Sequence, residues 1–138
     1  MGESVKIEVR NTLDALSPAT DAAESWLEQR QIGRDAVILA LLAIDELVTN
    51  CIKYGYDDAG EHVISISLSI EGETLGIQVI DDGHPFNPLD APPPDLSADI
   101  EDRQEGGLGL FLLRKLSDEI AYERLDGTNC LTIKKRIS

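Results

Sequence analysis

Two polar side chains on one stretch of the chain have the types and the spacing of a binding or catalytic site. Glu46 and Asn50 stand four residues apart in a segment of helical period, so they share one face of the expected helix, with Lys53 a further turn along. Residues 36–43 are all apolar, which indicates burial of this helix. A buried carboxylate and amide are costly without a partner, so the pair indicates a metal, water or ligand site. An exposed polar stripe explains the pair equally well when it is taken alone.

A third carboxylate ends the apolar face of an expected strand. Counting by twos, Asp81 continues the row of Leu75, Ile77 and Val79. A carboxylate in that place can accept a hydrogen bond from a donor such as the exocyclic amine of adenine. Gly83, two residues later, lets a backbone turn approach closely. An ordinary turn after a strand produces the same short pattern, so this motif is weak by itself.

A glycine turn opens directly into an apolar helix at Gly107, Leu108, Gly109 and Leu110. Exposed N–H groups at a helix start, with no side chains in the way, form a cradle for phosphate. The Gly-Lys-Ser/Thr sequence of a P-loop is absent, and no strand comes immediately before, as a dinucleotide-binding fold requires. A flexible hinge before a helix is the competing explanation.

The elements that must position these groups follow from hydrophobic period and turn residues. Ser17-Pro18 is expected to cap the first helix, and the Pro-rich segment 83–106 has neither period, which is typical of a functional loop or lid. The expected elements are an edge strand 5–10, helices from 17 to near 33, 35–54 and 110–116, a hairpin of 63–70 and 75–79, and two strands, 119–125 and 129–137, joined at Asp126-Gly127.

Length and composition limit the function. The 138 residues fit a single domain, 1–138. A formal net charge of −14 excludes a general phosphate-backbone binder, so no direct contact with nucleic acid is expected. No apolar run approaches the ~20 residues of a membrane span, and no signal peptide pattern is present, so the expected location is cytoplasmic. Cys51 and Cys130 lack metal-ligand spacing and are interpreted as small buried residues without function.

In this order, Glu-x-x-x-Asn, Asp-x-Gly, a loop and Gly-x-Gly-Leu resemble the N, G1 and G2 boxes of the GHKL ATPases and kinases. Segments 45–50, 54–56, 82–88 and 105–113 look more closely like the RsbW-type anti-sigma factor kinases, and the resemblance covers nearly the entire chain. It implies the Bergerat ATP-binding fold, an α+β two-layer sandwich with a mixed, mostly antiparallel sheet covered on one face by about three helices. It also implies ATP and Mg²⁺ as cofactors.

The resemblance further implies roles for individual residues. Glu46 would be the general base, Asn50 would hold Mg²⁺, and Lys53 would lie near the phosphates. Asp81 would bind adenine, and Gly83 would lie under the base. The backbone amides of Gly107, Leu108, Gly109 and Leu110 would contact the phosphates, and Thr128 would support the adenine pocket. Apart from the resemblance, Arg103 in the expected lid is an additional candidate to assist phosphoryl transfer. One departure is Pro85, which replaces the second glycine of the usual G1 box and puts the geometry of the lid hinge in doubt.

The leading hypothesis is a serine kinase that phosphorylates a STAS-type anti-anti-sigma protein and also sequesters a sigma factor. A nucleotide-gated binding module without kinase activity would need the same pocket and stays open as the alternative. A histidine-kinase catalytic domain would need a dimerising helical hairpin with a phosphoacceptor histidine, which this sequence does not contain. A structural protein without a ligand would not explain the glycine turn or the buried Glu-Asn pair. A homodimer is possible, and the sequence does not decide the oligomeric state.

Overall fold

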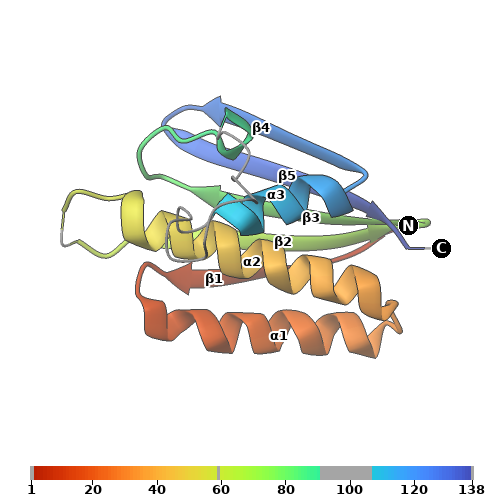
Figure 1. Ribbon diagram of the computed structural model, residues 1–138. Helices are drawn as coiled ribbons and strands as arrows, with labels where there is room; N and C mark the ends of the chain where they lie inside the picture. The colour runs from red at the N-terminus through yellow and green to blue at the C-terminus, as the bar shows by residue number, and fades with distance from the viewer. Residues whose placement is uncertain (1, 59, 91–106, 138) are drawn as a thin grey trace.

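Five antiparallel strands and the helices on one of their faces form two layers (Figure 1). The computed structural model describes residues 2–58, 60–90 and 107–137. The strand order is β1-β2-β3-β5-β4. The elements are β1 (Glu3–Arg10), η1 (Leu13–Ala15), α1 (Leu16–Gln29), α2 (Arg34–Tyr54), β2 (Val63–Glu71), β3 (Thr74–Asp81), η2 (Pro88–Asp90), α3 (Gly107–Leu116), β4 (Glu119–Leu125) and β5 (Thr128–Arg136).

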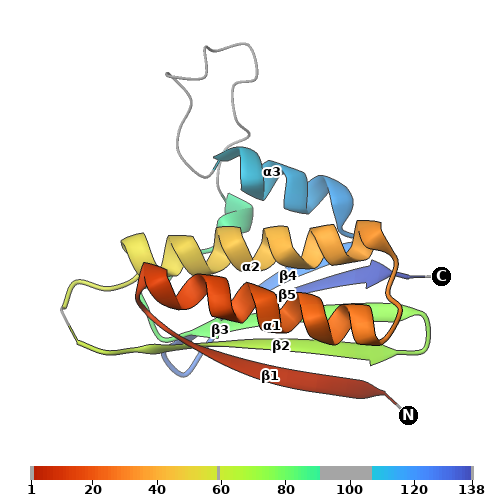
Figure 2. The same ribbon diagram turned by 90° about the horizontal axis from the view of Figure 1, so that it is seen from below.

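The three α-helices lie on the same side of the sheet (Figure 2). This arrangement confirms the predicted α+β class and the two layers. The prediction of a mixed sheet is not met, because every pairing of the described strands is antiparallel. The strands β3 and β4 run in the same direction, but β5 lies between them and is antiparallel to both, so no strand has a parallel neighbour.

Turn chemistry sets the two hairpins. In the turn between β4 and β5, Asp126 and Gly127 both have positive φ, 51° and 80°, as a two-residue type I′ turn requires. In the turn between β2 and β3, Gly72 supplies the positive φ of 59°. These turns fix the register of the strands, and therefore decide which side chains face the helices.

The core lies between the sheet and the helices. Along β2, Ile64, Ile66 and Leu68 are fully buried, while the serines between them lie on the opposite, half-exposed face. The helix α2 buries most of the apolar run in its first half, as predicted, but Ile38 within that run is 49% exposed. Its buried residues are Ala36, Val37, Leu39, Ala40, Ala43, Ile44, Leu47 and Val48. A helix held this firmly can fix the positions of the polar side chains that follow.

The start of the first helix differs from the prediction. Ser17 was expected as the N-cap, but α1 begins at Leu16 and its N-cap is Ala15, without a side-chain hydrogen bond. The 3-10 turn of η1 leads straight into the helix, so Ser17 lies inside the first turn, where its carbonyl accepts the Thr20 hydroxyl at 2.9 Å. Pro18 is tolerated there because the first N–H groups of a helix lack intrahelical partners.

Two other sequence expectations concern the later part of the chain. The third helix begins at Gly107, before the predicted start at residue 110, so the glycine turn is its first turn. The predicted lid, 83–106, lies outside the described residues from 91 onward. Among the helices of the described ranges, none combines the length and the apolarity needed to cross a membrane.

Replacing a core residue of β2 tests this assignment of faces. Ile66→Ala should lower the free energy of unfolding by about 2–5 kcal/mol, because it removes a fully buried side chain between sheet and helices. Ser67→Ala, one residue later on the opposite face, is the matched control and should change that free energy by less than about 0.5 kcal/mol. Urea denaturation followed by circular dichroism measures both, and equal losses would contradict the assigned faces.

Candidate functional site

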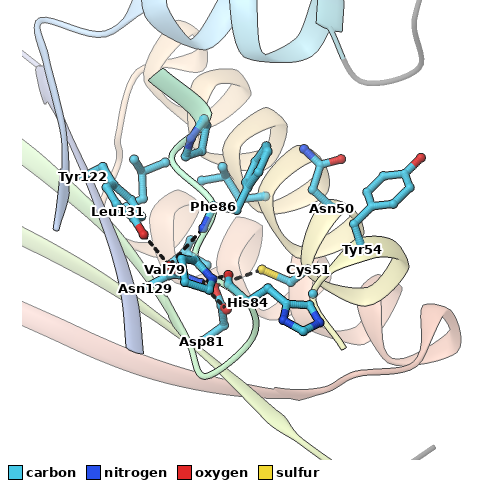
Figure 3. Close-up of a pocket in the computed structure, with 14 residues that line it drawn as sticks. Asn50, Cys51, Tyr54, Val79, Asp81, His84, Phe86, Tyr122, Asn129 and Leu131 are labelled. Carbon is cyan, nitrogen blue, oxygen red and sulfur yellow. Dashed lines mark hydrogen bonds between the residues drawn. The ribbon is translucent and has the colours of Figure 1, made fainter. Parts of the chain in front are cut away.

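A cavity of about 180 Å³ lies between the second half of α2, the ends of β3 and β5, and the segment after β3 (Figure 3). Its walls are mainly apolar, with a few polar groups among them. Pockets for drug-sized ligands measure roughly 300–1,000 Å³, so this cavity suits one ring system of a larger ligand. It is lined by Leu47, Asn50, Cys51, Tyr54, Gly55, Val79, Asp81, His84, Pro85, Phe86, Pro88, Tyr122, Asn129 and Leu131.

Asp81 is the acidic group of this cavity. It ends β3 on the same face as Leu75, Ile77 and Val79, and it is 7% exposed, which confirms the strand parity found in the sequence. Its Oδ1 accepts the Gly83 N–H at 2.9 Å and the Asn129 side-chain amide at 3.0 Å. Its Oδ2 accepts the Cys51 thiol at 3.1 Å. The carboxylate is therefore held by hydrogen bonds from three segments of the chain.

The turn after Asp81 packs against the end of α2. Gly83 is buried, and a Cβ added there would lie 2.7 Å from the carbonyl oxygen of Gly55. The His84 N–H donates to that same carbonyl at 2.8 Å. From the other side, the Arg124 guanidinium donates to the carbonyl of Gly83 at 2.8 Å. Glycine is required at position 83 because two backbone segments approach each other there.

Glu46 lies beside the first turn of α3. It is half-buried on α2, and Gly109 is buried opposite it. A Cβ added to Gly109 would overlap the carboxyl carbon and Cγ of Glu46. The absence of a side chain at position 109 thus lets a carboxylate of one helix reach the N-terminal turn of another, where helix N–H groups favour negative charge. This is the contact between the first and the third of the sequence motifs.

Asn50 is the predicted residue that joins this contact to the cavity. It lies one helical turn after Glu46 and lines the cavity, whereas Lys53 is exposed in the last turn of α2. Within the described ranges, no cluster of three His, Cys, Asp or Glu residues could hold a metal ion alone. Asn50 offers an amide oxygen, a donor that Mg²⁺ accepts when substrate phosphates complete its coordination. This oxygen fits a magnesium site that is shared with those phosphates.

The remaining predicted residues fall into three groups. The backbone of Gly107 and Leu108 forms the start of α3, and Leu110 is buried behind it. Arg103 lies outside the described residues. Thr128 does not line the cavity: it begins β5 and donates its hydroxyl to the carbonyl of Leu125 at 2.7 Å, within the hairpin. Its binding role, like those of the other site residues, stays a prediction.

Sequence reasoning missed Asn129, Cys51 and Tyr122, which all line the cavity. Asn129 alternates with Leu131 and Ile133 along β5, so the period-2 rule that placed Asp81 would have placed it on the same face. Asn129 also pairs directly with Asp81 in the strand register. The position of Cys51 next to Asn50 could have indicated that it lies near the site. Its contact with Asp81 depends on the packing of α2 against β3 and cannot be predicted from the sequence.

A polar cluster of Tyr56, Asp58, His62 and Asp82 joins the loop between α2 and β2 to the turn after β3. The rings of Tyr56 and His62 stack with centroids 4.1 Å apart. His62 contacts Asp58 at 2.9 Å and Asp82 at 3.3 Å, and the Tyr56 hydroxyl donates to Asp82 at 3.1 Å. The hydrogen bond to Asp58 raises the pKa of His62 above its ordinary value, and Asp82 adds to the rise. Since Asp82 follows Asp81 directly, this group ties the loop to the base of the cavity.

The sequence and the fold resemble characterised proteins. The family model described as "histidine kinase-like ATPase domain" matches residues 9–135. The serine/threonine-protein kinase BtrW of Bordetella bronchiseptica is 30% identical over 130 residues, covering 89% of this chain and 91% of BtrW. The serine-protein kinase RsbW of Bacillus velezensis is 29% identical over 98 residues, and the match spans 61% of its length.

One solved structure shares the fold. The crystal structure of the RsbU and RsbW domains of a Mycobacterium tuberculosis protein superposes with a TM-score of 0.70 at 19% sequence identity. The superposition covers 98% of this chain and 32% of the mycobacterial one. At that identity the likeness shows the arrangement of the elements alone.

The contact between Glu46 and Gly109 can be tested by a double-mutant cycle. Gly109→Ala should destabilise the fold by about 1–3 kcal/mol, because the new Cβ must displace the Glu46 side chain. In a Glu46→Ala background the overlapping atoms are gone, so most of that cost should disappear. Thermal denaturation of the four proteins measures the coupling. Equal costs in both backgrounds would show that the two residues do not meet.

The pH dependence of stability tests the charges around His62. A raised pKa in the folded state means that protonated His62 contributes stability in full below its ordinary pKa of 6.5, and that this contribution is lost as pH rises through the raised value. The pKa of Asp58 is lowered by the same hydrogen bond, so its contribution to stability is complete where the pH is above its ordinary pKa of 3.8. His62→Gln should therefore flatten the fall in melting temperature between about pH 6 and pH 8.

Asp58→Asn provides the second arm of this test. It removes the largest cause of the shift in His62, so it should flatten the same part of the curve while leaving the imidazole in place. A wild-type curve that keeps its shape in both variants would contradict the assigned partnership.

Proposed function

The chain belongs to the histidine kinase-like ATPase domain family, and from that premise we propose that it is an ATP-dependent protein-serine kinase. The relatives that support this activity by name are the serine kinases BtrW and RsbW. BtrW supports it over nearly its whole length, while the match to RsbW spans about three fifths of that protein.

The proposal rests on one observation: residues of α2 line the cavity, and another residue of the same helix lies against the first turn of α3. Cys51 and Asn50, on the second half of α2, line an apolar cavity that holds a buried carboxylate. One turn earlier, Glu46 lies against the first turn of α3 at Gly109. A base fits the cavity and phosphates fit this helix turn, because a helix N-terminus binds anions through its N–H groups.

In the proposed complex, Asp81 accepts a hydrogen bond from the exocyclic amine of adenine, and Gly83 leaves room for the base. The backbone amides from Gly107 to Leu110 donate to the phosphates. Asn50 holds Mg²⁺ through its amide oxygen, and Lys53 lies near the phosphates. When bound there, Mg-ATP would supply the γ-phosphoryl group, and its Mg²⁺ would neutralise part of the phosphate charge.

Glu46 is the proposed catalytic residue. Its carboxylate orients or deprotonates the serine hydroxyl that attacks the phosphorus. Phosphoryl transfer depends mostly on alignment and charge stabilisation, so a single carboxylate beside an anion-binding helix turn is sufficient protein chemistry. The position of Glu46 between Asn50 and Gly109 suits this role.

The proposed substrate is a serine of a STAS-type anti-anti-sigma protein, and a sigma factor is the second proposed partner. Phosphorylation would place about two negative charges at the interface with the STAS protein and so break that complex. With a formal net charge of −14 the chain itself would repel a phosphorylated surface. A cytoplasmic location is part of the same proposal, because a sigma factor is one of the proposed partners.

Labelled ATP tests the activity directly. Incubation with Mg²⁺ and a cognate STAS protein should place label on a serine of that protein. Glu46→Gln should reduce labelling at least about 100-fold, since it removes a general base, and should keep ATP affinity within about threefold. Glu8→Gln on β1, an exposed position far from the cavity, is the matched control and should label normally.

Complex formation that depends on ATP, without any label on serine, would contradict the kinase and support the nucleotide-gated binding module instead. Calorimetry of ATP binding to the wild-type protein separates both from a protein that binds no nucleotide.

A further inference from the structure

The acceptor atoms of Asp81 are unequally occupied. A carboxylate offers about four acceptor positions, two on each oxygen. Oδ1 has filled both of its positions, with the Gly83 N–H and the Asn129 amide. Oδ2, in the described part of the chain, accepts the Cys51 thiol alone. One acceptor position on Oδ2 is therefore left in the cavity that Asp81 and Cys51 both line.

We propose that Cys51 and Asn129 are specificity-determining residues, which fix Asp81 so that it presents this one acceptor position and thereby select a base with an amine at that place. The inference rests on the proposed nucleotide site and adds to it two positioning residues. Neither residue needs to touch the base itself, since both act through Asp81.

Asn129 is suited to hold Asp81 because its own side chain is saturated. Its Nδ2 donates to Asp81 Oδ1 at 3.0 Å and to the His84 carbonyl at 2.8 Å. Its Oδ1 accepts the Tyr122 hydroxyl and, at 3.4 Å, the Phe86 N–H. Two donors and two acceptors are all that an amide has. A buried amide with every group in use cannot rotate without losing several hydrogen bonds, so it holds Asp81 in one orientation.

Cys51 occupies the other oxygen as a donor. It lies 30 residues from Asp81 in the sequence, and the two side chains meet across the floor of the cavity (Figure 3). Burial raises the pKa of the Cys51 thiol, and the neighbouring charge of Asp81 raises it further. The group therefore stays a protonated thiol, and its S–H points to Oδ2. A thiol is a weak donor, so it orients this oxygen and leaves its second acceptor position available.

The consequence for base selection follows from donor and acceptor matching. Adenine carries an exocyclic amine at position 6, which donates to the remaining position on Oδ2. Hypoxanthine carries a carbonyl oxygen at position 6, which would face the carboxylate as a second acceptor. A buried acceptor left against another acceptor loses its hydrogen bond to water without replacement, so the wrong base is rejected.

The first arm of the test uses cysteine variants. Isothermal titration gives the Kd of Mg-ATP and Mg-ITP, whose bases differ at position 6. Wild-type protein should prefer ATP, and Cys51→Ala should lower the ratio Kd(ITP)/Kd(ATP) by about 3- to 10-fold, because Asp81 loses one of its fixed contacts. Cys51→Ser keeps a donor and should restore the ratio to within about twofold. Cys130→Ala, a half-buried cysteine outside the cavity, is the matched control and should leave it unchanged.

The second arm replaces the hydrogen-bond donor at position 129 by an acceptor. Asn129→Asp is nearly isosteric but replaces the donor to Asp81 by an acceptor, so it should lower the same ratio by at least about 10-fold. Asn87→Asp is its control, since the Asn87 side chain, among the described residues, uses only its oxygen, which accepts the Leu89 N–H and is retained in aspartate. Circular dichroism and melting temperature establish that each variant is folded.

The outcomes separate this inference from the proposed function. Wild-type protein that binds neither nucleotide would overturn the nucleotide site itself. Wild-type protein that prefers ATP, with folded Cys51→Ala and Asn129→Asp variants that keep the full ratio, would overturn the positioning roles and leave the nucleotide site standing. A loss in Cys51→Ala that Cys51→Ser does not restore would show that volume rather than the hydrogen bond is responsible, which also contradicts the inference.

Discussion

A buried carboxylate is the constraint on which the rest of this structure depends. Removing an ionised group from water is costly unless hydrogen bonds replace the water, and Asp81 receives them from β5, from α2 and from its own turn. Each of these contacts requires another. The Asn129 amide must be supported by Tyr122, and the turn must pack on the end of α2, where only glycine fits at position 83. One costly charge therefore organises three segments around one cavity.

The helix α2 carries out two tasks that place opposite demands on a sequence. Its first half buries most of its apolar residues against the sheet and the neighbouring helices, and only Ile38 of the apolar run is exposed, which anchors the helix. Its second half turns polar while it is still partly enclosed, so Glu46 and Asn50 are held at fixed positions without being surrounded by water. A rigid element is a better support for chemistry than a loop, because a displacement of 1 Å can cost much of a catalytic effect.

The glycines at the site show how close approach is achieved. Gly109 leaves the space that the Glu46 carboxylate fills, and Gly83 leaves the space for the carbonyl of Gly55. In both places a backbone meets a group from a distant part of the chain. This explains why motifs that are weak one by one become informative in combination: each glycine is matched to a partner that belongs to another motif.

The sequence by itself determined the local features, because they depend on neighbours along the chain. Alternation gave the strands and the burial of Asp81, the Asp126-Gly127 pair gave the last hairpin, and the order of the motifs gave the family. Only the tertiary structure decided which groups meet. The contacts of Asp81 with Cys51 and Asn129 span 30 and 48 residues, and they depend on the packing of α2 and on the register of β5. The same register sets Asn129 opposite Asp81 in the cavity, while Thr128, one residue earlier, does not line it. Alternation along the strand gives the face of Asn129, but only the pairing of β3 with β5 gives its partner.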